Sequence, residues 1–371
     1  MISAEELCEQ LSTLGIDGYI GVPDSLLKDF CAFVSTCEGR HIIAANEGNA
    51  VAIAAGRFLG TGRPSLVYMQ NSGIGNAVNP LLSLTDPDVY GIPVMLMIGW
   101  RGEPGKKDEP QHVKQGKVTL KLLESMDIPY IILDPAYSEY KKEVASLYAT
   151  MMERSGPVAI VVRSGAFHSC KCNVDYQEYP LTREQSLETI VDEMSEDDLV
   201  VSTTGKASRE LYEIRERRGM DQSRDFLTVG SMGHASSIAF GLASTQPDRR
   251  VFCIDGDGAM LMHMGAMAII GQSGIQNLVH IVLNNGSHES VGGQPTVAYS
   301  LDMVAIAKSC GYRNAFGVSK EEKLIEAMDC YEGPTFIEVR VKCGSRSDLG
   351  RPKTSPSENM RALMSFVGSK K

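Results

Sequence analysis

Short β-branched runs alternate with helix-length segments along the chain, and this alternation limits the fold more than any other feature. In the first half, the apolar runs predict strands at residues 19–22, 42–45, 65–69, 94–98, 130–133 and 158–162. In the second half, they predict strands at residues 199–202, 226–229, 251–254, 279–283 and 336–341. Such alternation is typical of parallel α/β units, in which a helix follows each strand. The sequence therefore predicts an α/β protein.

A polar, turn-rich stretch at residues 164–180 separates the two halves. Thr182 and Gln185 then form the pattern of a capping box, which predicts the start of a new helix. The chain has 371 residues, of which 43% are hydrophobic, so it is long enough for two cores. We therefore expect two domains, residues 1–175 and 176–371, each built on a doubly wound parallel sheet with no domain between them.

Charge and composition exclude several classes of partner. The formal charge is −10, and a nucleic-acid backbone requires a basic face, so we expect no nucleic-acid partner. The apolar runs are shorter than a membrane span, and the acidic, amphipathic N-terminus does not resemble a signal peptide. The nine cysteines include no CxxC pair, which favours reduced thiols. We expect a cytoplasmic protein with no membrane partner.

Two motifs follow neighbouring predicted strands. Gly256-Asp257-Gly258 comes after the strand at 251–254, and Asn284-Asn285 comes after the strand at 279–283. Glycines at a helix start allow backbone N–H groups to approach phosphate oxygens. Carboxylate and amide oxygens are ligands that Mg²⁺ prefers, and open α/β sheets bind ligands at the carboxyl ends of their strands. The first motif alone could mark a tight turn, but the pair predicts a metal and diphosphate site.

This pair of motifs resembles the signature of the thiamine-diphosphate-dependent enzymes. The resemblance implies that Asp257, Asn285 and the main-chain carbonyl of Ser287 hold Mg²⁺. It also implies that Gly256, Gly258 and Ala259 line the cofactor diphosphate. A second possible diphosphate contact consists of Thr203, Thr204 and Gly205. For the last three, an ordinary turn and helix cap is an equal alternative.

The same resemblance implies a glutamate at the start of a helix in the other domain. Glu47 follows the strand at 42–45 and precedes the Ala-rich helix at 50–59. It would hydrogen-bond or protonate the cofactor's aminopyrimidine N1′. The alternative is a first-turn acid that complements the helix dipole. Met232 would support the bent cofactor, and the Gly230 carbonyl would accept from its amino group; a core position is the alternative for Met232.

Most enzymes of this superfamily carry a third domain, for which this chain is too short. The resemblance therefore narrows to the compact decarboxylases of phosphonopyruvate and sulfopyruvate. The segments that carry it are GVPDS (21–25), NEGN (46–49), NSGIGN (71–76), RGEP (101–104), DEPQH (108–112), NNGSHES (284–290), GGQP (292–295) and DLGRP (348–352).

This resemblance implies decarboxylation of 3-phosphonopyruvate to phosphonoacetaldehyde and CO₂, in the synthesis of organic phosphonates such as 2-aminoethylphosphonate. A single fused chain favours this substrate, because sulfopyruvate decarboxylase is often split into two polypeptides. Decarboxylation of sulfopyruvate, carboligation and a non-catalytic cofactor-binding scaffold remain alternatives.

A phosphonate substrate requires cations or N–H donors, because it carries up to two negative charges beside its carboxylate. The expected substrate contacts are Asp24, Ser25, Lys28, Asn71, Arg101 and His112. We expect His112 and His288 to relay protons. Further candidate cations are Lys106, Lys107, Arg346 and Arg351. The charged stretch at residues 101–116 is expected to be a long loop, either functional or solvated.

Enzymes of this family bind the cofactor between two subunits. The resemblance therefore implies that Glu47 and Asp257 act on one cofactor from different chains. It implies self-association, with a homodimer as the smallest active unit.

Overall fold

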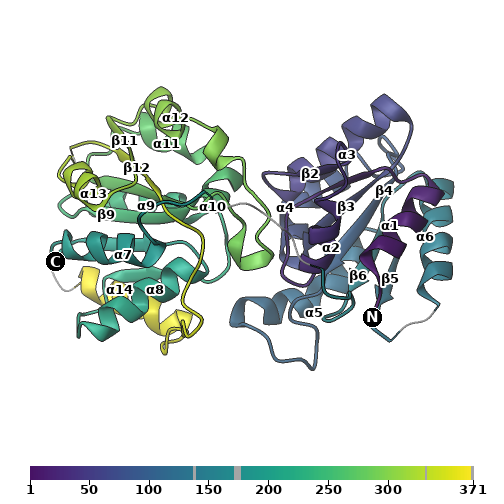
Figure 1. Ribbon diagram of the computed structural model, residues 1–371, viewed down its shortest axis with the longest axis horizontal. Coiled ribbons are helices and arrows are strands. Elements are labelled where there is room, and N and C mark those ends of the chain that lie inside the picture. The colour runs from purple at the N-terminus through teal and green to yellow at the C-terminus, as the bar shows by residue number, and fades with distance from the viewer. Residues whose placement is uncertain (137–138, 171–176, 331, 369–371) are drawn as a thin grey trace. The chain divides into compact units, whose positions relative to one another are not determined.

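The computed structural model describes residues 1–136, 139–170, 177–330 and 332–368 (Figure 1). The chain forms two compact units, one of residues 1–174 with 290–294 and one of residues 175–289 with 295–371. Together they account for the whole chain. The expected domain boundary near residue 175 lies outside the described residues. Each unit is built on a six-stranded parallel sheet, so the prediction of two parallel-sheet α/β domains is confirmed.

The first unit has the strand order β2-β1-β3-β4-β6-β5, with parallel pairing throughout. Its strands are β1 (Gly18–Gly21), β2 (His41–Ile43), β3 (Ser65–Gln70), β4 (Val94–Gly99), β5 (Tyr130–Leu133) and β6 (Val158–Val162). Its helices are α1 (Ala4–Leu14), α2 (Lys28–Val34), α3 (Glu47–Thr61), η1 (Asn71–Gly73), α4 (Ile74–Leu81), α5 (Pro110–Ser125) and α6 (Tyr140–Arg154).

Both faces of this sheet are covered by helices. Successive residues of β3 enter different cores: Leu66 and Tyr68 pack with α1, α2 and α6, whereas Val67 and Met69 pack with α3 and α4. A strand buried on both sides needs apolar residues at successive positions. This explains why the strands of the unit read as continuous apolar runs.

The second unit has the strand order β11-β12-β10-β9-β7-β8, also with parallel pairing. Its strands are β7 (Leu199–Ser202), β8 (Asp225–Leu227), β9 (Val251–Gly256), β10 (Leu278–Asn284), β11 (Asn314–Val318) and β12 (Thr335–Arg340). Its helices are α7 (Arg183–Asp192), α8 (Lys206–Arg217), α9 (Ala235–Thr245), α10 (Asp257–Met262), α11 (Ala266–Gln272), η3 (Ala298–Ser300), α12 (Met303–Cys310), α13 (Glu321–Met328) and α14 (Pro356–Gly368). The short helix η2 (Glu289–Val291) belongs to this unit at Glu289 only.

The two sheets have the same connectivity. Numbered within its own unit, each sheet runs 2-1-3-4-6-5. The chain leaves the first strand toward one edge and then returns to the other side of that strand, so the direction of winding changes between the first and third strands. In open α/β sheets, ligands bind at the carboxyl ends of the strands beside such a change.

Several local predictions need correction. The strand β11 was not predicted, because its sequence NAFGV is short and contains a glycine. After the first motif the chain forms two short helices, α10 ending at Met262 and α11 beginning at Ala266. The expected long loop at residues 101–116 ends early, because α5 begins at Pro110, a residue favoured in the first turn of a helix. The capping box of Thr182 and Gln185 is confirmed at the start of α7.

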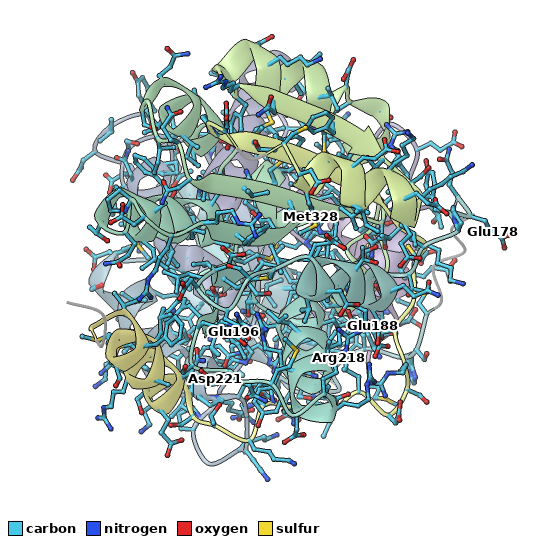
Figure 2. All side chains as sticks on the ribbon, turned by 90° about the vertical axis from the view of Figure 1, so that its left-hand side faces the viewer. Glu178, Glu188, Glu196, Arg218, Asp221 and Met328 are labelled. Carbon is cyan, nitrogen blue, oxygen red and sulfur yellow. The ribbon has the colours of Figure 1, made fainter. Side chains whose placement is uncertain are left out.

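Surface ion pairs join α7 to α8 in the second unit. Arg217 Nη2 lies 2.6 Å from Glu188 Oε1, and Arg218 pairs with Asp192. Glu188 lies on α7 and Arg218 directly follows α8; both are labelled in Figure 2. None of the described helices combines the length and apolar character that crossing a bilayer requires.

Candidate active site

In the first unit, the expected site residues follow four adjacent strands. Glu47 comes after β2, Asp24 and Ser25 after β1, Asn71 after β3, and Arg101 after β4. Because the strands are parallel, these residues share one edge of the sheet. His112, in the first turn of α5, joins them through contacts described below. Lys28 begins α2 and is exposed, so its expected role in substrate binding stays a prediction.

Glu47 is the first residue of α3 and is buried, with 5% of its surface exposed. The preceding Asn46 caps the helix by accepting a hydrogen bond from the Asn49 N–H at 3.0 Å. Asn76 Nδ2 donates to Glu47 Oε2 at 2.8 Å. A Cβ on Gly73 would lie 2.4 Å from Glu47 Oε1, so only glycine leaves space for this carboxylate. Residues from α3, η1 and α4 therefore define where the glutamate lies.

Asp24 is a buried residue of the loop that follows β1. Its Oδ2 accepts the Leu26 N–H at 2.9 Å and lies directly over Gly99, where a Cβ would be 2.1 Å away. Burial raises the pKa of Asp24 to about 6, although its backbone hydrogen bonds and the charge of Arg101 oppose the shift. The carboxyl group is thus poised to change protonation near neutral pH.

Arg101 and His112 meet at one carboxylate, that of Asp108. Arg101 Nε donates to Asp108 Oδ2 at 2.9 Å, Arg101 Nη2 donates to Oδ1, and His112 Nδ1 lies 2.9 Å from Oδ1. Although burial opposes the shift, the hydrogen bonds from Arg101 and His112 hold the pKa of Asp108 well below its usual range. Arg101 Nη1 also donates to Ser25 Oγ at 2.7 Å. The loop after β1 is thereby joined to the loop after β4.

Asn71 fixes the backbone of the same loop. Its Nδ2 donates to the Arg101 carbonyl at 2.8 Å and to Thr119 Oγ1 at 2.9 Å, and its Oδ1 accepts the Arg101 N–H at 3.3 Å. Asn71 is 1% exposed and lies in η1, next to Gly73. This position makes Asn71 a structural link between the Glu47 carboxylate and the Arg101 loop.

In the second unit, the two motifs meet at adjacent strand ends. Gly256 pairs with Leu283 in the register of β9 and β10, so Asp257 and Asn285 both lie just beyond the sheet edge. Asp257 begins α10, is buried, and accepts hydrogen bonds from the Thr296 hydroxyl and from the Asn285 backbone N–H. Desolvation raises the pKa of Asp257 to about 6, partly offset by these neutral donors.

The two asparagines of the second motif have different surroundings. Asn284 Nδ2 donates to Glu338 Oε1 at 2.7 Å and its Oδ1 accepts the Gly286 N–H, so this residue supports the turn. Asn285 Oδ1 accepts the Ser287 N–H at 3.1 Å, and its Nδ2 donates to Glu289 Oε2 at 3.0 Å.

Glu289 is held in place from two helices. Its carboxylate lies 2.9 Å from Arg183 Nη1 on α7 and 2.7 Å from Lys206 Nζ on α8. Glu289 therefore fixes the amide of Asn285 against charged groups at the starts of α7 and α8.

The remaining expected cofactor contacts follow β7 and β8, and β7 is the neighbour of β9. Thr203 is buried, and Thr204 Oγ1 accepts the Gly230 N–H at 3.2 Å, which joins the two strand ends. Gly205 has φ +105° and precedes α8. Met232 is 38% exposed on a turn in which Ser231 and both flanking glycines have positive φ. The alternative that Met232 is a buried core residue is therefore wrong for this structure.

His288 packs against the glycine-rich turn. A Cβ on Gly258 would lie 3.1 Å from His288 Nδ1, so a side chain there would meet the imidazole. Burial lowers the pKa of His288 to about 4, so the ring is neutral at pH 7. The expected proton relay through His288 stays a prediction.

The donor set at this second edge fits a divalent cation and a diphosphate. The Asp257 carboxylate is desolvated and surrounded by neutral donors, a state that a bound cation would stabilise. Gly256, where a Cβ would meet no atom within 4 Å, leads directly into α10, so the backbone at this residue is accessible to phosphate oxygens. In the first unit, the space left by Gly73 holds the Glu47 carboxyl group.

Comparison with known proteins identifies the family. The family model described as "Thiamine pyrophosphate enzyme, N-terminal TPP binding domain" matches residues 1–123, and the corresponding C-terminal model matches residues 203–339. A phosphonopyruvate decarboxylase of Streptomyces viridochromogenes is 36% identical over an alignment that covers 99% of this chain and 95% of the relative. The chain belongs to the thiamine pyrophosphate enzymes.

Two further relatives match along the same length. A phosphonopyruvate decarboxylase of Streptomyces hygroscopicus is 34% identical, covering 99% of this chain and 94% of the relative. A sulfopyruvate decarboxylase of Methanosarcina acetivorans is 28% identical over an alignment that covers 99% of this chain and 98% of the relative. The resemblance of this chain to thiamine-dependent decarboxylases is thereby confirmed.

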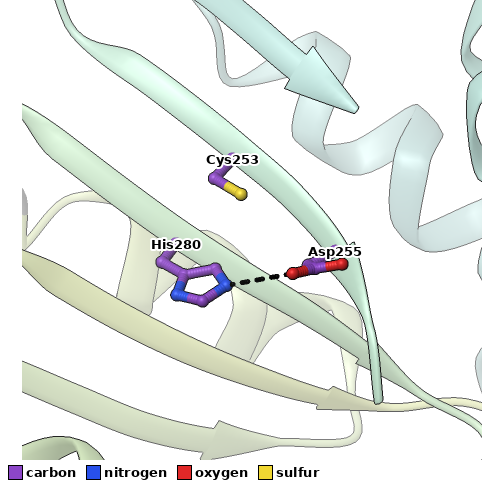
Figure 3. A group of neighbouring side chains, drawn as sticks. All are labelled: Cys253, Asp255 and His280. Atoms are coloured by element: carbon purple, nitrogen blue, oxygen red, sulfur yellow. Dashed lines mark ion pairs between the residues drawn. The ribbon is translucent and has the colours of Figure 1, made fainter. Parts of the chain in front are cut away.

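A third polar cluster lies within the second sheet rather than at its edge. Cys253 and Asp255 on β9 face His280 on β10, and all three are buried (Figure 3). Asp255 Oδ2 lies 3.7 Å from His280 Nε2, while Asp255 Oδ1 accepts the Gly256 N–H at 2.9 Å. We interpret this cluster as internal support for the turn that carries Asp257.

Sequence reasoning missed three residues that hold the site together, namely Asn76, Asp108 and Glu289. All three lie inside quoted segments, NSGIGN, DEPQH and NNGSHES, and Asp108 is four residues before His112, a spacing of about one helical turn. This spacing was a usable signal for Asp108. Asn76 and the ion pairs of Glu289 depend on tertiary contacts between separate elements.

Proposed function

We propose that this chain is a thiamine-diphosphate- and Mg²⁺-dependent decarboxylase that converts 3-phosphonopyruvate and a proton to phosphonoacetaldehyde and CO₂, in the synthesis of organic phosphonates such as 2-aminoethylphosphonate. The observation that carries the proposal is the match to curated phosphonopyruvate decarboxylases at 34–36% identity over 99% of the chain. The same chemistry is supported by the position of Glu47 at the strand ends of the first sheet and by that of Asp257 with Asn285 at the strand ends of the second.

Each unit has its own role in the proposal. Residues 176–371 form the diphosphate and metal domain, where the Asp257 and Asn285 side chains and the Ser287 carbonyl hold Mg²⁺. Residues 1–175 form the pyrimidine domain, where Glu47 holds a proton at pyrimidine N1′. The bound cofactor supplies a carbon nucleophile for the ketone and accepts the electron pair that CO₂ leaves behind.

The other residues of the chain bind and orient. Asn76 holds the Glu47 carboxylate by its hydrogen bond, so the proton is delivered at one position. Asp24, Ser25, Lys28, Asn71, Arg101 and His112 form the proposed substrate side, and Gly230 and Met232 support the cofactor. His112 and His288 are the proposed proton carriers for the product.

The proposal includes self-association in the cytoplasm, with a homodimer as the smallest active unit. Its support is the family membership, in which one cofactor is shared between subunits. Light scattering after size exclusion, with and without cofactor and Mg²⁺, measures the assembly. A fully active monomer would contradict this part of the proposal.

The direct test is CO₂ release from phosphonopyruvate, sulfopyruvate and pyruvate at equal concentrations, with product analysis. We expect the highest kcat/KM with phosphonopyruvate and phosphonoacetaldehyde as the product. Sulfopyruvate decarboxylase is the second candidate, because a curated sulfopyruvate enzyme matches 99% of the chain. Faster turnover of sulfopyruvate would replace the substrate and leave the roles of Glu47 and Asp257 intact.

A further inference from the structure

Asp108 is the centre of a network in the first unit that joins the loop after β4 to the start of α5 and, through Arg101, to the loop after β1. Its Oδ2 accepts from Arg101 Nε and from the Gly102 N–H at 2.7 Å, and its Oδ1 accepts from Arg101 Nη2, His112 Nδ1 and the Glu109 N–H. The Asp108 side chain is 14% exposed and that of Arg101 20% exposed. A carboxylate with this many donors has one fixed orientation, and the groups that bind it are fixed with it.

The network leaves part of the Arg101 guanidinium available. A guanidinium carries five N–H donors. Three of them are used by Asp108 and Ser25, which leaves one N–H on Nη1 and one on Nη2. Each of these two nitrogens therefore keeps one N–H that can donate to an oxygen of an anionic group, from a guanidinium whose plane Asp108 holds.

The network also sets the tautomer of His112. An ionised carboxylate only accepts hydrogen bonds, so the proton of a neutral His112 ring lies on Nδ1. Nε2 is then the nitrogen that can accept from a ligand, or donate when the ring is charged. Exchange of Asp108 for a neutral residue would release both Arg101 and His112.

Decarboxylation itself indicates which end of the substrate belongs on such a fixed cation. The carboxylate loses its charge as CO₂ leaves, so strong stabilisation of that charge in the ground state would oppose the reaction. The second anionic group stays in the product. A rigid guanidinium is therefore useful on the retained group and counterproductive on the departing one.

We propose that the two free N–H donors of Arg101 bind the retained phosphonate of the substrate, and that Asp108 is the positioning residue that holds Arg101 and His112 for this contact. The inference rests on the proposed function for the identity of the anion. It goes beyond that function by assigning the two ends of the substrate and a role for Asp108.

Kinetics with three variants test this inference. Arg101→Lys keeps a positive charge but loses the planar guanidinium, and Asp108→Asn keeps the shape but loses the charge that holds the guanidinium. We expect each variant to raise the KM for phosphonopyruvate, and the Ki of the probe phosphonoacetate, at least tenfold, with a smaller change in kcat. The matched control is Glu103→Gln, which alters a buried carboxylate in the same loop that pairs with Arg163 and Lys106 instead. Glu103→Gln should have the KM for phosphonopyruvate and the Ki of phosphonoacetate of the wild type.

Pyruvate separates a specific contact from a general loss of activity, because it lacks the phosphonate. The ratio of kcat/KM for phosphonopyruvate to that for pyruvate should fall in both variants and stay constant in Glu103→Gln. Folded variants that keep this ratio and the phosphonoacetate Ki would overturn the inference. If Asp108→Asn does not fold, Arg101→Lys decides alone.

The wild-type protein distinguishes failure of the inference from failure of the proposed function. If the wild type does not decarboxylate phosphonopyruvate but turns over sulfopyruvate, the proposed substrate is wrong. The same variants are then compared with sulfoacetate as the probe. Loss of sulfoacetate binding in Arg101→Lys would support the anion contact, and unchanged binding would overturn it.

Discussion

Asn76 Nδ2 donates a hydrogen bond to Glu47 Oε2 at 2.8 Å, and this contact orients the only side chain that we place at the pyrimidine. Asn76 lies on α4 and Glu47 at the start of α3, so the contact joins two helices that pack on one face of the first sheet. The carboxyl group is thus buried, hydrogen-bonded and fixed in position before any ligand binds.

Exchange of Glu47 for Gln tests the role of this carboxyl group. The amide can occupy the same space but cannot move a proton in the same way. We expect kcat to fall by about 10²–10⁴-fold, the usual contribution of a general acid or base, while thiamine diphosphate still binds. Steady-state kinetics and a calorimetric cofactor titration measure the two effects. Turnover close to that of the wild type would refute the role.

Gly73→Ala should displace the same carboxyl group without replacing it. The new Cβ would lie 2.4 Å from Glu47 Oε1, whereas the backbone of Gly73 has φ −71°, which alanine adopts freely. We expect at least a tenfold loss of kcat in a folded protein. Gly75→Ala, at a nearby position where a Cβ meets no atom within 4 Å, is the matched control and should be as active as the wild type. Equal activities of the two variants would contradict the steric argument.

Glu289→Gln should weaken the metal site through Asn285. The Glu289 carboxylate accepts from Asn285 Nδ2, and residues that orient a metal ligand typically contribute 10–100-fold to affinity. We expect the Mg²⁺ concentration for half-maximal activity to rise by about that factor. Glu188→Gln removes a carboxylate that only joins α7 to α8, so its Mg²⁺ dependence should match the wild type. An unchanged Mg²⁺ dependence of Glu289→Gln would show that Asn285 is oriented by other contacts.

Asp24 should make stability depend on pH. Burial raises its pKa to about 6, so the folded protein holds a proton that the unfolded chain releases at about pH 4. The stabilisation that this group contributes is complete below about pH 4 and is lost as the pH rises through about 6, a change of about 3 kcal/mol. Asp24→Asn should remove that loss. Urea unfolding of both proteins at several pH values between 4 and 8 measures this loss, and a constant difference between the two proteins would contradict the expectation.

Asp225→Asn should destabilise the second unit strongly. Arg215 Nε lies 2.5 Å from Asp225 Oδ2, and both side chains are fully buried. Removal of one partner leaves an uncompensated charge in the core, which typically costs about 3–5 kcal/mol. Asp192→Asn breaks an exposed pair with Arg218 and should cost about 0–1 kcal/mol. Denaturant unfolding compares the two variants. Similar losses would show that the buried charge is neutralised in another way.

The sequence predicted most of the architecture because strands buried on both faces have a strong apolar signal. The runs that contain Val67 and Ile281 are examples, and both lie in central strands. The edge strand β11 was missed because it pairs on one side only, with β12, and contains Gly317 in a partly exposed pattern. Its strand character comes from its neighbour rather than from its own residues.

The candidate site was predictable where one residue type in one local pattern implies a chemistry. Asp257 and Asn285 belong to this class, since each follows a strand and offers an oxygen ligand. The contacts that hold those residues were not predictable, because Thr296 reaches Asp257 and Lys206 reaches Glu289 from separate elements. A linear pattern indicates the reacting group, whereas its support arises only when distant segments are folded together.

The shared connectivity of the two sheets has a consequence for how such a chain can change. In both halves most of the candidate site residues follow four adjacent strands at one rim of the sheet, while mainly apolar clusters fill the layers beneath. The same connectivity thus carries a candidate acid, Glu47, in the first unit and candidate metal ligands in the second. A change of specificity would require substitutions at a few loop residues, whereas the apolar residues that determine the fold could stay the same.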